Sequence, residues 1–326
     1  MTHLTYLEAA VVGLVQGVSE LFPVSSLGHN VLIPALVGGS WARDLNVARP
    51  ESPYLAFIVG LHVATAIALI IYFWRDWLRV IGGFLGSLRH VARPPAGASR
   101  WQLSADERLA WMIILATIPV GVAGLAFEHL FRVIFGRPVV AAVFLAVNGV
   151  ILLAGERHVR RRSARRDGPG VPGREPAAGD HQAARVREIA EAAESDRRLS
   201  GMGYGEAVLI GSAQILALLA GISRSGVTMV GGMFRGLSRE DAARFAFLLA
   251  TPVILAAGAL KIPDLTGPLG NGIHGQVLVG SVLSGIGAYV SVRYLVRYFQ
   301  TRTLTPFAIY CLIAGVGSVV YLGLVK

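Results

Sequence analysis

Residues 16–29 read Gln-Gly-Val-Ser-Glu-Leu-Phe-Pro-Val-Ser-Ser-Leu-Gly-His and end an apolar segment that starts near residue 4. Gln16 and Glu20 are four residues apart, so they share one face of a helix. Pro23 cannot continue that helix but suits the first turn of a new one, which is expected to run to about Val37. The sequence therefore predicts a hairpin of two short helices, with polar residues gathered at the break between them.

The same pattern returns 198 residues later. The identities at this one offset, without a gap, include seven pairs that match Tyr6, Glu8, Ala9, Gly13, Gln16, Ser25 and Gly28 with Tyr204, Glu206, Ala207, Gly211, Gln214, Ser223 and Gly226. So many matches over about two dozen positions indicate an internal duplication. The second hairpin is expected over residues 205–219 and 222–234, with its break at Ala220 and Gly221.

Composition places both hairpins in a membrane. Hydrophobic residues make up 54% of the 326 residues and charged residues only 15%, whereas soluble domains carry about 25% charge. Apolar runs near the roughly 20 residues that cross a bilayer predict spans at 56–74, 109–127, 139–155, 243–262, 276–296 and 305–325. The single cysteine, Cys311, lies in the last span, which excludes an internal disulfide and a thiolate metal site. The N-terminal segment lacks a basic region and a cleavage site, so no removable signal peptide is expected.

Positive charge alternates between the loops. Arginine clusters follow the first, third and fifth spans, whereas the loops between them carry few basic residues. The positive-inside rule therefore places the loops near 75–108, 156–203 and 293–304 in the cytoplasm. This topology accounts for the net charge of +10, and no nucleic-acid partner is expected.

Three spans follow each hairpin, so the second half begins on the opposite side of the membrane if the hairpins do not cross it. This is an inverted-topology duplication, in which the site lies near the midplane between the halves. We predict an all-α polytopic membrane protein with about six transmembrane helices and two re-entrant hairpins. Its expected parts are a first half over 1–155, a cytoplasmic linker over 156–203 and a second half over 204–326. In the linker, 157–178 is expected to be disordered and 181–199 to form a polar helix.

The first break gathers groups that are typical of catalysis. A carboxylate such as Glu20 in an apolar re-entrant helix is costly, so it is interpreted as functional. Ser25 and Ser26 are expected in the first turn of the next helix, where free backbone amides and the helix dipole favour an anion. His29 follows one turn later, on a similar face. Each residue alone has a structural explanation, such as serine packing between membrane helices, but together they indicate a site.

The second break supplies a cation. Arg224 is the only basic residue between residues 208 and 234, and its planar fork of donors suits a phosphate. The alternative is a structural ion pair between Arg224 and Glu20, which would still bring the two halves together. Hydroxyl donors and a residue without a side chain complete the predicted binding set: Ser223, Ser225, Thr228 and Gly226.

Together the two breaks predict a phosphoryl-transfer site. Arg224 and the two helix N-termini would hold the phosphates and stabilise charge in the transition state. One of the two serine hydroxyls or a water would attack, with Glu20 or His29 as the base. Glu20, with Gln16, is alternatively a ligand of a divalent cation, Mg²⁺ or Ca²⁺, that bridges the phosphates.

These motifs, in this order, resemble the undecaprenyl-diphosphate phosphatase (bacitracin-resistance) family. That family has a Glu/Gln-x-x-x-Glu element running into Phe-Leu-Pro-Val-Ser-Ser-x-Gly-His, which residues 16–29 match. Its second element, Pro-Gly-x-Ser-Arg-Ser-Gly-x-Thr, is matched by residues 220–228. The likeness covers nearly the whole chain apart from the linker and continues at 231–233, 237–239, 247–250 and 306–310.

The resemblance implies a multi-pass enzyme of the bacterial inner membrane. Such an enzyme removes the terminal phosphate from a C55 polyprenyl diphosphate lipid and so recycles the carrier for peptidoglycan synthesis, and a divalent cation is associated with its activity. The family's functional roles fall on Glu20, Ser25, Ser26, His29, Arg224 and Thr228, with Gln16 at the variable Glu/Gln position. Three departures stand out: Gln16 cannot act as a base, Ala220 replaces the motif proline, and the linker is longer than is usual.

A rival hypothesis belongs to another class of protein. Inverted halves with re-entrant hairpins are equally a transporter plan, so the chain is alternatively a carrier that flips a polyprenyl phosphate without hydrolysing it. Hydroxyls and an imidazole beside a carboxylate favour hydrolysis, because a carrier needs charge compensation but no nucleophile or base. A structural or drug-efflux protein explains neither Arg224 nor residues 25–29. The sequence leaves the chain length of the lipid and the oligomeric state open, a homo-oligomer included.

Overall fold

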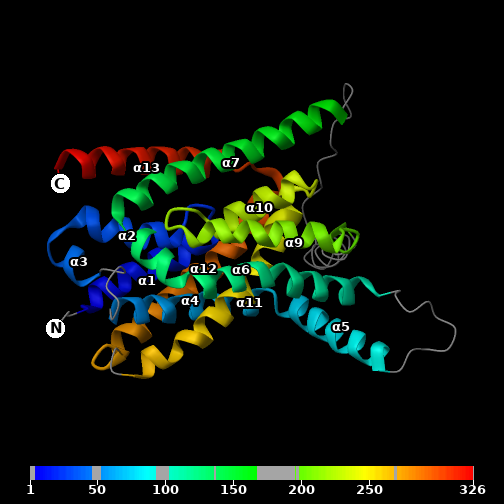
Figure 1. Cartoon of the computed structure of the whole chain (residues 1–326), viewed down its shortest axis with the longest axis horizontal. Coiled ribbons are helices and arrows are strands. Elements are labelled where there is room, and N and C mark those ends of the chain that lie inside the picture. The colour runs from blue at the N-terminus through cyan, green and yellow to red at the C-terminus, as the bar shows by residue number, and fades with distance from the viewer. Residues whose placement is uncertain are drawn as a thin grey trace, which may run out of the picture.

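The computed structural model describes residues 4–45, 53–92, 103–135, 137–166, 195, 198–267 and 270–325. Within these residues all regular structure is helical (Figure 1). The first half contains α1 (Tyr6–Leu21), α2 (Ser26–Val37), α3 (Gly39–Asp44), α4 (Pro53–Tyr72), α5 (Trp74–Ala92), α6 (Ala105–Phe135) and α7 (Pro138–Arg166). The second half contains α9 (Tyr204–Ser212), the 3₁₀ helix η1 (Ala213–Leu218), α10 (Arg224–Phe234), α11 (Arg239–Thr266), α12 (His274–Thr301) and α13 (Thr305–Val325).

Helix length and composition confirm a polytopic membrane protein. In the described part of the chain, five helices are long and apolar enough to cross a membrane, namely α6, α7, α11, α12 and α13. A sixth candidate is formed by α4 and α5 taken together, although the two are bent by 86° at their junction. Five of the predicted spans fall within single helices, whereas the first, 56–74, runs past the end of α4 at Tyr72 and reaches the start of α5. The opposite orientation of the two halves stays a prediction.

Both predicted hairpins are present. Thr5 caps α1 through a capping box with Glu8. At the start of α9 Gly203 has no side chain, and only the second bond of the box is made, from the Gly203 N–H to Glu206 at 3.1 Å. The matched residues 6–9 and 204–207 therefore mark equivalent helix starts. The breaks separate α1 from α2 and η1 from α10. One detail of the prediction was wrong: α2 begins at Ser26 rather than at Pro23, because Ser25 takes the N-cap position.

The contacts between helices are similar in the two halves. The matching helices α4 and α11 are in contact, and so are α7 and α13. The first helix of each hairpin packs on a span of the other half, α1 on α12 and α9 on α6. The two hairpins use small residues for this contact, as membrane helices do. A Cβ atom added at Gly13 would lie 2.4 Å from the carbonyl oxygen of Gly280, and one at the matching Gly211 would lie 2.0 Å from that of Ala116. The backbones therefore touch directly.

Residues 75–108 contain more structure than the predicted loop. Trp74, Leu78, Ile81 and Leu85 are exposed and recur every three or four residues along α5, which is the pattern of an amphipathic helix. The arginines of this segment were the reason that a loop was predicted. A helix of this kind at 86° to α4 has the geometry of one that lies along a membrane surface.

The beginning of the predicted linker is also helical. The helix α7 continues to Arg166, so residues 157–166 are not part of a disordered segment. Glu156 accounts for this extension, because it binds Arg160 one turn later at 3.1 Å and such pairs stabilise helices. Residues 167–194, and with them most of the predicted disordered stretch and polar helix, lie outside the described residues. The domain boundaries stay a prediction.

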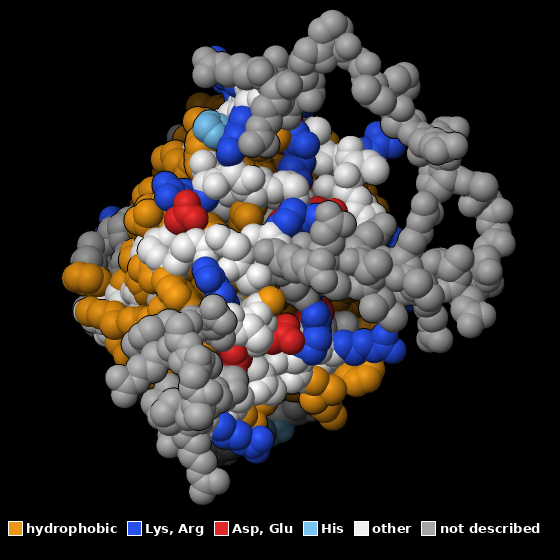
Figure 2. Space-filling model, turned by 90° about the vertical axis from the view of Figure 1, so that its right-hand side faces the viewer, with side chains coloured by type: hydrophobic (Ala, Val, Ile, Leu, Met, Phe, Trp, Pro, Cys, Tyr) orange, Lys and Arg blue, Asp and Glu red, His pale blue; other side chains and the backbone are white. Residues whose placement is uncertain are grey.

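Basic residues gather at one end of the molecule. The end of α5, the start of α6, the end of α7 and the start of α9 lie together at the right of Figure 1, and Figure 2 shows Lys and Arg side chains spread over that end. Carboxylates there pair with arginines from other segments: the buried Glu156 with Arg239, the buried Asp241 with Arg198, and the partly exposed Asp76 with Arg244. The described helix ends that flank the loops predicted at 75–108 and 156–203 therefore lie at one end, in agreement with the charge pattern.

The contact between α1 and α12 predicts opposite effects for two glycine substitutions. Gly13→Ala is expected to lower the thermal unfolding midpoint in detergent, because overpacking costs about 1–3 kcal/mol. Gly124→Ala in α6 is the matched control, since nothing lies within 4 Å of a Cβ added there, and alanine favours a helix interior by about 0.5–1 kcal/mol. An unchanged midpoint for Gly13→Ala would contradict the close backbone contact.

Candidate active site

The two helix breaks meet. Ser25 is the N-cap of α2 and Ser223 is the N-cap of α10, and each hydroxyl oxygen accepts from a glycine N–H three residues later, at 3.2 Å. The breaks touch directly, because a Cβ atom added at Gly28 would lie 2.9 Å from the Cα of Gly221. Gly221 has φ +108°, a backbone conformation that favours glycine. The N-termini of two helices, with their free amides, are thus brought to one place.

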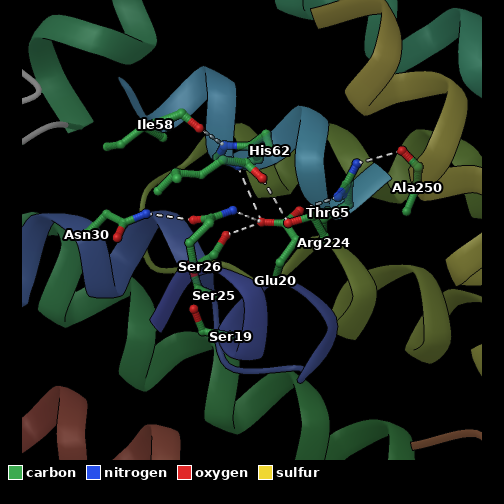
Figure 3. A network of polar contacts seen from close by, with 12 residues as sticks. Ser19, Glu20, Ser25, Ser26, Asn30, Ile58, His62, Thr65, Arg224 and Ala250 are labelled. Atoms are coloured by element: carbon green, nitrogen blue, oxygen red, sulfur yellow. Dashed lines mark hydrogen bonds and ion pairs between the residues drawn. The ribbon is translucent and has the colours of Figure 1, made fainter. Parts of the chain in front are cut away.

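A single carboxylate lies between these two N-termini. Glu20 lies at the end of α1. Its Oε2 accepts a hydrogen bond from the Ser26 hydroxyl, and its Oε1 forms an ion pair with the Arg224 guanidinium (Figure 3). Ser26 and Arg224 are the first residues of α2 and α10. They are equivalent positions of the two copies, which are 198 residues apart. At the place that matches Glu20, the second half has Leu218. The duplicated hairpins therefore produce one site instead of two.

An amide chain extends the site along α1 and α2. Gln16 donates to Glu20 Oε2 at 2.9 Å, and Asn30 donates to Gln16 Oε1 at 2.7 Å. On the opposite side, Arg224 also donates to the backbone carbonyl of Ala250 at 3.1 Å. Gln16 is fully buried and Glu20 is 7% exposed, so the carboxylate is held among donors with little contact with the outside.

His62 is the functional candidate that the sequence analysis missed. Its Nε2 lies 3.3 Å from Glu20 Oε2, and its Nδ1 lies 2.9 Å from the carbonyl oxygen of Ile58 (Figure 3). The side chain reaches the site from α4, which belongs to neither motif. The signal was present, because an ionisable residue inside a predicted span is a functional candidate in its own right.

His29 lies away from the carboxylate. Its Nδ1 is 2.7 Å from the carbonyl oxygen of Ser25, and its Nε2 is 2.7 Å from the Tyr310 hydroxyl. The two rings are nearly parallel, with centroids 5.7 Å apart. The structure therefore joins His29 to the late 306–310 motif on α13, and it favours Glu20 over His29 as the base for a serine hydroxyl.

The other polar residues of the motifs mainly shape the backbone. Ser25 has φ +70°, an unusual conformation for a residue with a side chain and one that is concentrated at functional turns. Ser223 and Ser225 share a hydrogen bond of 3.1 Å, and Thr228 donates to the carbonyl of Arg224 at 2.8 Å. With Gly226, whose N–H is bound by Ser223, they fix the first turn of α10. The Arg224 guanidinium is thereby aimed at Glu20.

The donor set does not fit a cage for a divalent cation. The part of the chain that the structure describes contains no group of three His, Cys, Asp or Glu side chains close enough to share a metal. Glu20 is the one carboxylate at the centre, and both of its oxygens are engaged, one of them by Arg224. Mg²⁺ and Ca²⁺ need several oxygen ligands. A cation would therefore depend on oxygens of the substrate.

Fold and site together define a multi-pass membrane protein with a buried polar centre where two helical hairpins meet. Residues 9–317 match the model of the family described as bacitracin resistance protein BacA, and the chain belongs to this family. Proteins named undecaprenyl-diphosphatase are 61% identical in Mycolicibacterium paratuberculosis, over 99% of both chains, and 60% identical in Mycobacterium avium, also over 99% of both. A protein named undecaprenyl-diphosphatase 2 from Frankia alni is 53% identical over 97% of each chain. The resemblance inferred from the two motifs is confirmed.

Proposed function

We propose that this protein is a membrane phosphatase that hydrolyses undecaprenyl diphosphate, a C55 polyprenyl diphosphate, to the monophosphate and inorganic phosphate. The observation that carries the proposal is the contact of one buried carboxylate, Glu20, with both the Ser26 hydroxyl and the Arg224 guanidinium. A hydroxyl bound to a base, next to a fixed cation at two helix N-termini, is what phosphoryl transfer requires. The names of the relatives support the same substrate.

In the proposed mechanism each group has one role. The Arg224 guanidinium and the free amides of α2 and α10 bind the terminal phosphate. The Ser26 oxygen attacks that phosphorus as Glu20 accepts the hydroxyl proton, and the bond to the bridging oxygen breaks, so that the lipid monophosphate leaves. Protonation removes the charge of Glu20, which strengthens the pairing of Arg224 with the phosphate. Water then attacks the phosphoserine, Glu20 returns its proton to the serine oxygen as the phosphorus–oxygen bond breaks, and inorganic phosphate leaves with both protons of the water.

Placement in the bacterial inner membrane follows from this substrate. A multi-pass protein that returns the carrier lipid to its monophosphate form would recycle it for peptidoglycan synthesis. It would also confer resistance to bacitracin, in line with the family description. The membrane lipid itself is then the partner that delivers the substrate.

The rival hypothesis of a carrier without hydrolysis is less well supported by the site. A carrier needs a cation to neutralise the phosphate, and Arg224 alone would supply it. It does not need a serine hydroxyl bound to a carboxylate at a helix N-terminus, which is the arrangement that Ser26 and Glu20 form.

The main experiment measures phosphate release from C55 polyprenyl diphosphate by the purified full chain in detergent. Arg224→Ala and Glu20→Ala are each expected to lower kcat by about 10³-fold or more, the scale of a catalytic arginine in phosphoryl transfer, while the protein remains folded. Arg235→Ala is the matched control, because Arg235 follows the other end of α10 and pairs with Glu206 at the surface. Near-normal turnover in Arg224→Ala would contradict the proposed mechanism.

The same assay addresses the cation and the rival function. Release that persists in EDTA would show that the residues of the cluster suffice. Release that needs added Mg²⁺ or Ca²⁺ would support a cation bound mainly by the phosphates of the substrate. No release from a folded wild-type protein would refute the phosphatase and turn attention to lipid flipping in vesicles.

The attacking group is tested with the two neighbouring serines. Ser26→Ala is expected to abolish turnover, because the hydroxyl bound to Glu20 is removed. Ser25→Ala is expected to lower stability by about 1 kcal/mol through loss of the helix cap and to retain measurable turnover. A covalent phosphoenzyme, trapped by acid quench in the wild type and absent from Ser26→Ala, would support serine attack. Substantial turnover in Ser26→Ala would instead favour direct attack by water.

His62 is tested by a pair of substitutions of similar size. His62→Leu is expected to lower kcat by about 10- to 100-fold, which corresponds to the loss of one hydrogen bond to a charged group. His62→Gln is expected to retain most of the activity, since an amide N–H can still donate to Glu20. Equal activity of the two variants would remove the hydrogen bond to Glu20 from the mechanism.

A further inference from the structure

One buried side chain bonds to both helix breaks. Asn148 lies on α7 and is fully buried. Its Nδ2 donates to the carbonyl oxygen of Pro23 in the first break at 2.9 Å, and its Oδ1 accepts from the N–H of Ser223 in the second break at 3.0 Å. A third contact, from Nδ2 to the Cys311 sulfur on α13, measures 3.3 Å. One amide thus spans the junction between the halves.

These bonds satisfy backbone groups that have no helical partner. Pro23 lies between α1 and α2, and Ser223 precedes the first turn of α10, so neither group is bonded within a helix. An unsatisfied backbone group in the apolar part of a membrane costs several kcal/mol. The breaks are also linked from Ser225 Oγ to the carbonyl of Phe22, but at 3.4 Å. The amide of Asn148 therefore makes the shorter bonds.

Other residues of α7 pack against the second break. A Cβ atom added at Gly221 would lie 2.3 Å from the carbonyl oxygen of Ala141 and 2.7 Å from the N atom of Leu145. One turn beyond Asn148, Leu152 lies 3.1 Å from where a Cβ of Gly226 would be. Positions 141, 145, 148 and 152 share one helix face. The second hairpin thus lies along this face, with Asn148 in the middle of it.

We propose that Asn148 is a positioning residue that sets the distance between the attacking hydroxyl and the phosphate-binding arginine. It holds Pro23 three residues before Ser26 and Ser223 immediately before Arg224, so it fixes the two backbones that carry these side chains. A displacement of about 1 Å in such a pair costs on the order of 10²-fold in rate. The effect on turnover rests on the proposed phosphatase function, whereas the effect on the backbone does not.

The second break has Ala220, which leaves its backbone freer than a proline would, and the bond from the Ser223 N–H to Asn148 lies three residues later. A proline would restrict the second break from within the backbone. Leu219, the residue before it, is already extended, with φ −80° and ψ 119°, as a residue before proline must be. In this chain the side chain of Asn148 supplies the restraint from outside.

The test uses the full-length protein in detergent with two readouts. Hydrogen–deuterium exchange of a peptide covering 219–226 reports the bond of the Ser223 N–H directly. Exchange of a peptide covering 21–28 reports through the neighbouring amides whether the Pro23 segment is held in place. Neither readout refers to catalysis. Steady-state release of phosphate from the C55 diphosphate reports kcat and KM separately. The variants are Asn148→Ala and Asn148→Ser, the second of which keeps a hydrogen-bonding group in case the first does not fold. Cys311→Ala is the control, because it keeps both bonds between Asn148 and the breaks. It removes the third contact of Asn148 and the long contact, 3.8 Å, between the Cys311 sulfur and the Pro23 carbonyl.

In both Asn148 variants the backbone amides of the two peptides are expected to exchange at least tenfold faster than in the wild type. The rest of the chain is expected to exchange at the wild-type rate. We expect kcat per folded molecule to fall about 10- to 100-fold, consistent with misplacement of reacting groups, with KM changed less than about threefold. The unfolding midpoint should also fall, because two buried backbone groups lose their partner. Adding Ala220→Pro to Asn148→Ala should recover at least fivefold in kcat. Cys311→Ala should match the wild type in every readout.

Other outcomes overturn the proposal. Unchanged exchange at the two breaks in a folded Asn148 variant would show that the amide does not restrain them. A loss of activity that only follows a lower unfolding midpoint, with kcat per folded molecule unchanged, would assign Asn148 to general stability. If the wild type releases no phosphate but exchange still accelerates in the variants, the proposed function fails while the restraint stands.

Discussion

The structure depends on the need to neutralise one carboxylate inside an apolar protein. Glu20 cannot remain charged and buried without donors, and its partners Gln16, Ser26, His62 and Arg224 come from α1, α2, α4 and α10. No single segment of the chain satisfies it. The two hairpins and the first span must therefore assemble before the charge is accommodated, so that formation of the site and packing of the halves are the same event.

Duplication explains how the partners come to face each other. The N-caps Ser25 and Ser223 are equivalent, and the next residue in each copy points at the same carboxylate, one as a hydroxyl and the other as a guanidinium. Leu218 stands at the position that matches Glu20, so the second hairpin adds no carboxylate and the donors have a single buried charge to neutralise. Two copies of one backbone shape thus provide complementary chemistry, with a hydroxyl in one copy and a cation in the other.

The sequence predicted much of this because the breaks carry strong local signals. Pro23, Gly221 and the polar residues around them located both hairpins, and the alternative of an ion pair between Glu20 and Arg224 already placed these side chains together. His62 and Asn148 were not found, because each sits singly in an apolar span and nothing in such a run shows which face meets the hairpins. The N-cap role of Ser25 depends on a positive φ angle, which cannot be predicted from the residue type because serine rarely adopts it. The helix α5 was missed for another reason. Its arginines led to the prediction of a loop, although its apolar residues recur with the spacing of an amphipathic helix.

The contact between Gly13 and Gly280 also has a mechanical consequence. Where two helices meet backbone to backbone, no side chain stands between them that can change rotamer and let one slide past the other. We therefore expect α1 and α12 to move as one rigid body, and α9 and α6 as another. Any opening that admits a lipid head group has to occur at interfaces made of side chains, such as the contact of α2 with α13, where His29 and Tyr310 meet through a single hydrogen bond and one stacked pair of rings.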